Sequence, residues 1–261
     1  EYIEQHWTIL EPLCLWLNDI KYIPDKYRTE EMYEIEVQQN GDFLSFVLEH
    51  MRTEEICKMA VKQNGLALQY VPETLRTKEM CQLALKQNGL ALYDIPEILR
   101  TRELYELAVQ KYGDSLREVP EELKTKEMCN LAVKNDGNSL QYVPEELKTQ
   151  ELCELAVEQS GMALRYVTEQ LRTEELCKLA ISNHIYALKY VPEDLRTREL
   201  CELAVKKHGM ALQYVPLKLR TKELCEIAVQ KNGWTLTFIP EDVITEELCK
   251  LAVEKSGMVL R

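Results

Sequence analysis

The apolar residues of this chain recur with a period of 24 residues. A typical unit reads T-x-E-L-C-x-L-A-V-x-x-x-G-x-A-L-x-Y-V-P-E-x-L-R, and its first position is occupied by Thr29, Thr53, Thr77, Thr101, Thr125, Thr149, Thr173, Thr197, Thr221 and Thr245. Nine complete units occupy residues 29–244, and a tenth, partial unit spans residues 245–261. A constant period of this length is typical of a solenoid, in which every unit packs on its neighbours.

The first half of a unit has the pattern of a helix. In the unit at residues 125–148, Thr125 is a favoured N-cap, because its hydroxyl accepts a hydrogen bond from a free backbone N–H of the first turn. The apolar residues that follow cover an arc of about 200° at about 100° per residue. They are Met128, Cys129, Leu131, Ala132 and Val133. An arc this wide predicts a helix with neighbours on both sides, and Gly137 is expected to end it in the left-handed conformation.

The second half of the unit is interrupted by proline. Leu140, Val143 and Leu147 keep helical spacing, but Pro144 lies between them and cannot continue a regular helix. We expect either a turn that ends at Val143 with a new turn starting at Pro144, or a kinked short helix, in part 3₁₀. Since no segment alternates like a strand, the sequence predicts an all-α solenoid of about ten repeats, each with one long helix and one short, Pro-interrupted segment.

The array is expected to run without a linker over residues 20–261. Residues 20–28 match the tail of a unit in the same register, whereas residues 1–19 match no unit and are interpreted as an N-terminal capping segment. Ile185 stands where the other units carry glycine, and Thr168 replaces the usual proline. We therefore expect a local irregularity at residues 182–188, because a β-branched residue in the left-handed conformation costs about 1–2 kcal/mol.

Charge and hydropathy narrow the function classes. There are 44 acidic and 32 basic residues, and the net charge is -12. This balance argues against direct binding of nucleic acid, which needs basic side chains to neutralise phosphates. No uninterrupted apolar run is long enough to cross a membrane.

Eight of the nine cysteines share one repeat position. Equivalent positions on stacked helices lie about 8–10 Å apart, which exceeds the Cα separation of about 7 Å that a disulfide tolerates. Tyr33 and Tyr105 occupy the same position in two other units, so a column of metal ligands is not expected. The sequence predicts buried structural thiols and, from so many free thiols, a reducing compartment such as the cytoplasm.

Candidate catalytic chemistry is sparse. His184 and His208 are one repeat apart, which is too far for one zinc ion, and a cation there is favourable at a helix end. No nucleophile motif or phosphate-binding loop is present in the sequence. We expect no enzyme activity, no cofactor and no metal.

The repeat resembles a known family. The segment AVKQNGLALQYVPETL at Ala60–Leu75, and its copy at Ala204–Leu219, is similar to a bacterial and viral helical-repeat family catalogued only as a domain of unknown function. That family commonly has Ala-Ser where this chain has Val71 and Pro72, so the second segment is expected to differ here. The resemblance implies a helical-repeat fold and brings no activity. A more distant likeness is to leucine-rich-variant repeats, which alternate α- and 3₁₀-helices; their iron–sulfur cysteines have no counterpart here.

Positions that vary between units are candidates for binding. An aromatic column lies two residues after the constant leucine, and its clearest members are Tyr142, Tyr166, Tyr190 and Tyr214. Arg165 and Lys189 directly precede two of them, and tyrosine and arginine are enriched in protein interfaces. The alternative is that each ring packs over the next unit with its hydroxyl in water. Asp94 and Glu118 in the same column favour partial exposure.

A second irregular column directly follows the glycine and includes Tyr186 and Trp234. Large apolar residues exposed there would form a recognition surface. The sequence therefore favours a non-enzymatic scaffold that binds a protein or peptide. The alternatives are an acidic decoy that occupies a basic nucleic-acid-binding surface of another protein, and a spacer within a longer protein.

Overall fold

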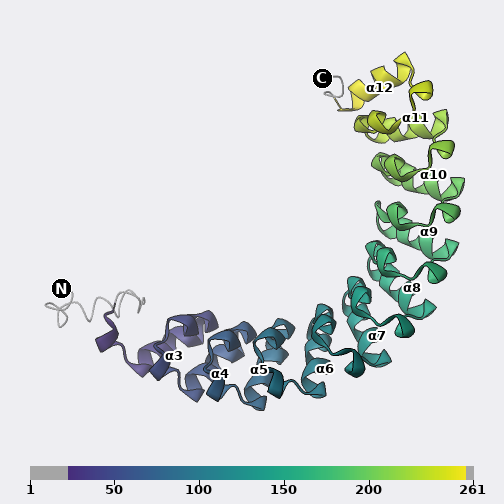
Figure 1. Cartoon of the computed structure of the whole chain (residues 1–261). Coiled ribbons are helices and arrows are strands. Elements are labelled where there is room, and N and C mark those ends of the chain that lie inside the picture. The colour runs from purple at the N-terminus through teal and green to yellow at the C-terminus, as the bar shows by residue number, and fades with distance from the viewer. Residues whose placement is uncertain (1–22, 257–261) are drawn as a thin grey trace. The chain divides into compact units, whose positions relative to one another are not determined.

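The protein is an all-α solenoid, as the repeat pattern predicts (Figure 1). A computed structural model describes residues 23–256, and within that range there is no β-strand. Ten α-helices follow one another at the sequence period, each joined to the next by two short 3₁₀-helices. The predicted capping segment at residues 1–19, the start of the half unit at residues 20–22 and residues 257–261 lie outside the described range.

One unit illustrates why these residues form these elements. Thr125 accepts a hydrogen bond on Oγ1 from the N–H of Met128 at 3.2 Å and so caps the first turn of α7. After α7, the chain forms one 3₁₀-helix of six residues and another of three, separated by extended backbone at Val143 and Pro144. The expectation of a 3₁₀ segment interrupted at proline is therefore confirmed. Proline suits this place because its fixed φ matches the extended conformation required before the last turn.

The elements have the following bounds. The α-helices are α3 (Glu30–Gln39), α4 (Glu54–Gln63), α5 (Lys78–Gln87), α6 (Arg102–Lys111), α7 (Lys126–Asn135), α8 (Gln150–Gln159), α9 (Glu174–Asn183), α10 (Arg198–Lys207), α11 (Lys222–Lys231) and α12 (Glu246–Ser256). The first 3₁₀-helices of the units are η3 (Gly41–Phe46), η5 (Gly65–Tyr70), η7 (Gly89–Asp94), η9 (Gly113–Glu118), η11 (Gly137–Tyr142), η13 (Gly161–Tyr166), η15 (Ala187–Tyr190), η17 (Gly209–Tyr214) and η19 (Gly233–Phe238). The three-residue 3₁₀-helices are η2 (Asp25–Tyr27), η4 (Glu49–Met51), η6 (Glu73–Leu75), η8 (Glu97–Leu99), η10 (Glu121–Leu123), η12 (Glu145–Leu147), η14 (Glu169–Leu171), η16 (Glu193–Leu195), η18 (Leu217–Leu219) and η20 (Glu241–Val243).

The role predicted for the repeated glycine is wrong. Helix α7 ends at Asn135, the following residue Asp136 is extended with φ -148°, and Gly137 is already the first residue of η11. A Cβ atom on Gly137 would lie 2.3 Å from the carbonyl oxygen of Ala156 in the following helix. Six other units have the same close approach. The position therefore needs glycine because successive units touch backbone to backbone there, and not because the helix ends in a left-handed residue.

Each unit buries two stripes of side chains, one from the α-helix and one from the first 3₁₀-helix. In α7 the inward residues are Met128, Cys129, Ala132 and Val133, and the constant leucine of η11, Leu140, has no exposed surface. Neighbouring units share such layers: α8, for example, packs against η13 of its own unit and against η11 of the preceding one. The apolar arc predicted from the sequence is thus the core of the stack, except for Leu131, which is only half-buried.

In seven units of the described range, the basic residue at the end of the unit ties it to the next one. Arg196 donates from Nε to the Val191 carbonyl at 2.9 Å and from Nη2 to the Lys189 carbonyl at 3.2 Å, both within its own unit. Its Nη1 donates to the carbonyl of Tyr214 in the following unit at 3.1 Å. Equivalent bonds to the following unit are made by Arg52, Arg76, Lys124, Lys148, Arg172 and Arg220. We call these residues the clamp.

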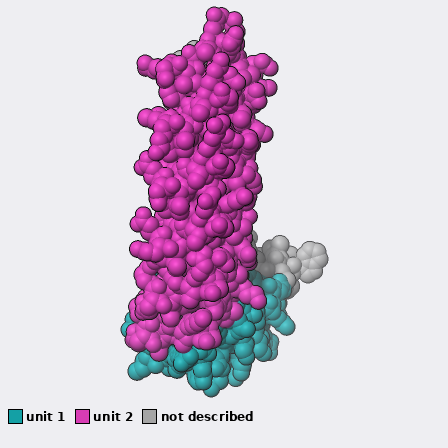
Figure 2. All heavy atoms as spheres, turned by 90° about the vertical axis from the view of Figure 1, so that its right-hand side faces the viewer, with its two compact units in different colours: residues 1–119 teal, residues 120–261 magenta. Residues whose placement is uncertain are grey.

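The chain also divides into two compact parts, each made of several 24-residue repeats (Figure 2). We call residues 1–119 unit 1 and residues 120–261 unit 2, and a "unit" without a number remains one repeat. In the described part of unit 1, helices α3–α6 stack in sequence order, and in unit 2 helices α7–α12 do the same (Figure 1). No helix in the described range is long and apolar enough to cross a membrane.

Residues 182–188 depart from their neighbours, as predicted. Helix α9 ends normally at Asn183, but η15 begins only at Ala187 and has four residues instead of six. By analogy with Gly161, whose added Cβ would lie 2.4 Å from the Ala180 carbonyl oxygen, the side chain of Ile185 cannot make the usual close approach to the next helix. Thr168, in contrast, keeps the conformation of the proline that it replaces, with φ -60° and ψ 147°.

Candidate functional site

The aromatic column lies on the surface of the 3₁₀ layer. In unit 2 it consists of Tyr142, Tyr166, Tyr190, Tyr214 and Phe238, each the last residue of a six- or four-residue 3₁₀-helix and each partly exposed. The backbone carbonyl of each accepts a hydrogen bond from the clamp residue of the preceding unit. The column is therefore neither core nor freely mobile: its backbone is fixed at the junction between units while part of each ring faces solvent.

Arg165 and Lys189 each lie beside the tyrosine that follows them. The guanidinium carbon of Arg165 is 4.3 Å from the centroid of the Tyr166 ring, and Nη2 donates to the hydroxyl of that tyrosine. Nζ of Lys189 is 5.7 Å from the centroid of the Tyr190 ring. Both cations are exposed. The structure thus brings the predicted tyrosines and cations together in pairs, which orients the rings through cation–π contacts.

The column that follows the glycine lies next to the aromatic column. A 3₁₀-helix has three residues per turn, so residues i and i+3 lie on the same side. Met162 therefore lies on the side of Arg165, and Met210 on the side of Gln213, whose amide donates to the Met210 carbonyl at 3.1 Å. Tyr186 is 38% exposed and Trp234 is 48% exposed.

Three adjacent columns therefore form one surface in unit 2, which we call the 3₁₀ face. It comprises the aromatic column, the column after the glycine (Asn138, Met162, Tyr186, Met210 and Trp234) and the column between them (Gln141, Arg165, Lys189, Gln213 and Thr237). In unit 1 the same columns carry Asp42, Asp94, Asp114 and Glu118. Partial burial raises the pKa of the Asp94 carboxyl above its ordinary value. Among residues 23–256, only the unit 2 part has these three columns free of carboxylates.

A row of carboxylates borders this face. Lys124 of the clamp donates from Nζ to Glu121 Oε1 at 2.6 Å and to the Tyr142 carbonyl at 2.9 Å, so the start of η10 lies beside the aromatic column of the next unit. Lys148 makes the equivalent pair of bonds to Glu145 and Tyr166. Seven exposed carboxylates of this row make no ion pair within residues 23–256. We call them the acidic rim: Glu122, Glu146, Glu169, Glu193, Asp194, Glu241 and Asp242.

The cysteines at the shared repeat position lie inside the stack. Seven are buried and Cys249 is half-buried, and all eight are free thiols. Burial raises the pKa of the Cys153 and Cys177 thiols to about 11. A thiol with so high a pKa is a poor nucleophile, because little thiolate forms at neutral pH. No group of three potential metal ligands occurs in the part of the chain that the structure describes.

The two histidines at the helix ends lie beside Tyr186. Nδ1 of His184 accepts a hydrogen bond from the N–H of Tyr186 at 3.2 Å, directly after α9. The Tyr186 ring lies between the two imidazoles, with centroids 5.8 Å from His184 and 6.1 Å from His208. The histidines therefore support the exposed Tyr186 ring on the 3₁₀ face.

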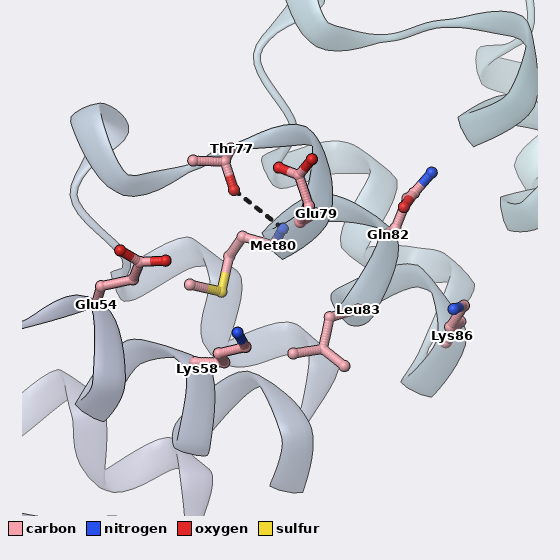
Figure 3. A pocket seen from close by; sticks show the side chains of 8 residues that line it. All are labelled: Glu54, Lys58, Thr77, Glu79, Met80, Gln82, Leu83 and Lys86. Atoms are coloured by element: carbon pink, nitrogen blue, oxygen red, sulfur yellow. Dashed lines mark hydrogen bonds between the residues drawn. The ribbon is translucent and has the colours of Figure 1, made fainter.

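A pocket of about 250 Å³ lies on the opposite, α-helical layer of unit 1, between α4 and α5 (Figure 3). Met80 and Leu83 line it together with charged residues of both signs, among them Glu54 and Lys58. A smaller depression with the same repeat positions, including Leu248 and Leu251, lies between α11 and α12. Because the same hollow recurs, we interpret it as a consequence of stacking helices, without a dedicated set of ligand-binding groups.

Four adjacent segments match one family, described as "Domain of unknown function (DUF4116)": residues 53–100, 101–148, 149–196 and 197–244. Each matched segment contains two of the 24-residue repeats. The chain belongs to this family, which confirms the resemblance based on the repeat motif. No curated protein and no solved structure matches the chain.

Proposed function

We propose that this protein is a non-enzymatic scaffold that binds another protein or a peptide through the 3₁₀ face of unit 2. The observation that carries the proposal is the partial exposure of Tyr186 and Trp234 beside the aromatic column. Partly exposed aromatic rings held by a rigid backbone supply contact area at low entropic cost. Solenoids of this kind commonly bind along one extended face.

The arrangement of the rings supports recognition more than stability. The core of each unit is already closed by leucine, alanine, valine and cysteine, so the protruding part of Trp234 adds nothing to it. Asp94 and Glu118 occupy the aromatic column in unit 1 without disturbing η7 or η9. Since the fold tolerates charges at this position, aromatic residues there in unit 2 serve another purpose.

The test is affinity capture from lysate followed by mass spectrometry. The binding variant combines Tyr186→Ala with Trp234→Ala, which removes the two most exposed rings in the described part of unit 2 and should leave the helical content unchanged by circular dichroism. A second variant replaces Tyr142, Tyr166, Tyr190 and Tyr214 by alanine. The control combines Leu155→Ala with Leu203→Ala on the α-helical layer, where both side chains are half-buried. Partners that are lost with the first two variants and kept with the control support the proposal, and equal capture by all variants contradicts it.

The acidic rim favours one second candidate function, the decoy for a basic nucleic-acid-binding surface. The affinity of such binding would depend on the net charge and would be lost at several hundred millimolar salt, because exposed charges are then screened. Contacts centred on Tyr186 and Trp234 persist at the same salt concentration. A salt titration of the captured partners therefore separates the two functions.

We further propose that the protein works in a reducing compartment such as the cytoplasm. Seven buried free thiols and one half-buried one support this, since oxidising compartments favour disulfides. Recovery of the native protein with its thiols oxidised would contradict it.

A further inference from the structure

We infer that the partner segment is a basic polyproline II helix that lies along the 3₁₀ face, with its prolines on the aromatic rings and its arginines or lysines on the acidic rim. The inference rests on the proposed function and names the chemistry of the partner. It follows from three features of unit 2: the spacing of its rings, the distribution of its charges and the position of its rim.

The spacing of the rings fits one turn of polyproline II per repeat. Packed helices of successive units are separated by about 8–10 Å. A polyproline II helix has three residues per turn and rises about 3.1 Å per residue, or about 9.3 Å per turn. A β-strand repeats its side-chain direction every two residues, or about 6.7 Å, and so drifts out of register. Rings at Tyr190 and Tyr214 therefore meet equivalent residues of a polyproline II ligand three positions apart.

The shape of the rings also suits proline. Aromatic side chains that stand side by side form shallow grooves, which accept the flat, preordered face of a proline-rich segment. On the 3₁₀ face the rings of Tyr186, Tyr190 and Tyr214 come from two successive units and are backed by rigid 3₁₀-helices. A preordered ligand on a preordered surface loses little conformational entropy on binding.

The charges decide between a basic and an acidic segment. The three columns of the 3₁₀ face in unit 2 carry two cations, Arg165 and Lys189, and each lies against its neighbouring tyrosine ring. The acidic rim carries seven exposed carboxylates without ion pairs in the described part of the chain. Electrostatic complementarity therefore favours a ligand with Lys or Arg on the rim side.

The clamp explains why two carboxylates of the rim, Glu169 and Glu193, stay free. Where the clamp residue is Lys148, its Nζ is shared between Glu145 and a carbonyl. Where it is arginine, as at Arg172 and Arg196, the guanidinium donates to three carbonyls. Glu169 and Glu193 thus have no cation of their own, although they occupy the repeat position of Glu145, which shares Lys148 with the Tyr166 carbonyl. The rim at η14 and η16 is the part best suited to bind a ligand's guanidinium or ammonium group.

The experiment is a fluorescence anisotropy titration of the purified chain with three labelled peptides. The first peptide consists of four Pro-Pro-Arg triplets. The second consists of four Gly-Ser-Arg triplets, which carry the same charge but do not form a polyproline II helix in advance. The third consists of four Pro-Pro-Glu triplets. We expect the Pro-Pro-Arg peptide to bind at least tenfold more tightly than either of the others. Equal binding of both arginine peptides would reduce the interaction to charge alone and overturn the inference, as would a preference for the Pro-Pro-Glu peptide or no binding at all.

Variants of the rim provide the second readout. Combining Glu169→Gln, Glu193→Gln and Asp194→Asn changes only exposed side chains, so the fold is retained, and should weaken Pro-Pro-Arg binding at least fivefold. The matched control combines Glu154→Gln, Glu158→Gln and Glu174→Gln on the α-helical layer and should change affinity less than twofold. An equal loss in both variants would contradict a site at the rim. If capture depends on Tyr186 and Trp234 but none of the peptides binds, the proposed function stands and this inference fails.

Discussion

Arg196 and Tyr214 are joined by a hydrogen bond from Nη1 to the backbone carbonyl at 3.1 Å, across 18 residues of sequence and from one repeat to the next. The same guanidinium holds two carbonyls of its own unit. The junction between repeats is thus made by a charged side chain that satisfies three backbone acceptors, in addition to the apolar core. Tyr214 takes its place on the 3₁₀ face because its backbone is held in this way.

The first prediction concerns this clamp. Arg196→Ala should lower the free energy of unfolding by about 2–4 kcal/mol, because three partly buried carbonyls lose a charged donor. Arg196→Lys should cost less, since Lys124 and Lys148 hold the same position with a single ammonium group. Urea unfolding followed by circular dichroism measures both variants. A loss below about 0.5 kcal/mol for the alanine variant would show that the clamp does not stabilise the junction.

The second prediction concerns the close approach of successive units. Ile185→Gly should raise the stability by about 1 kcal/mol and restore a six-residue 3₁₀-helix, because the side chain that keeps the backbone away from the next helix is removed. The reverse change, Gly161→Ala, should cost about 1–3 kcal/mol, since its Cβ would lie 2.4 Å from the Ala180 carbonyl oxygen. Thermal unfolding compares the two. Destabilisation by Ile185→Gly would mean that this side chain fills space that the stack needs.

The third prediction concerns Thr168. Its φ of -60° is the value that proline requires, and its N–H makes no backbone hydrogen bond in the described part of the chain. Val167 before it is extended, as the residue before a proline must be. Thr168→Pro should therefore stabilise the protein by about 0.4–1 kcal/mol by restricting the unfolded chain. A lower midpoint of thermal unfolding for the variant would contradict this.

The fourth prediction concerns alkaline pH. Burial raises the pKa of the Cys153 and Cys177 thiols from 9.0 to about 11, so between these values the unfolded chain has lost the thiol protons and the folded chain still holds them. The free energy of unfolding should accordingly fall as pH rises from 9 to 11. A variant with Cys153→Ala and Cys177→Ala should lose less stability over this range, whatever its stability at pH 7. Identical slopes for both proteins would show that these thiols do not contribute.

Much of the fold follows from the sequence because the repeat is strict. Thr125 as N-cap, the apolar arc of α7 and the break at Pro144 are local signals repeated in nearly every unit, so they identify the elements and their order. The role of Gly137 was predicted wrongly, because a glycine after a helix usually marks a left-handed turn. Only the distance to the Ala156 carbonyl oxygen shows that packing sets this residue.

The candidate surface was only partly predictable. Variation between units pointed to Tyr190, Lys189 and Tyr186, and the structure places all three on one face. The clamp was missed, although a basic residue ends most units, because a repeated arginine on the surface resembles a solubilising charge. Its bond to Tyr214 depends on how units stack, which no local pattern encodes.

The most direct test of the account is site-specific photo-crosslinking in cells. A photoreactive phenylalanine analogue is introduced at Tyr186 or Trp234 on the 3₁₀ face, and, as matched positions on the α-helical layer, at Lys178 or Glu254, which are also exposed. The account predicts a discrete crosslinked partner from the first two positions and none from the other two. The same crosslinks from both layers, or crosslinks from the α-helical layer alone, would contradict the claim that the 3₁₀ face of unit 2 is the binding surface.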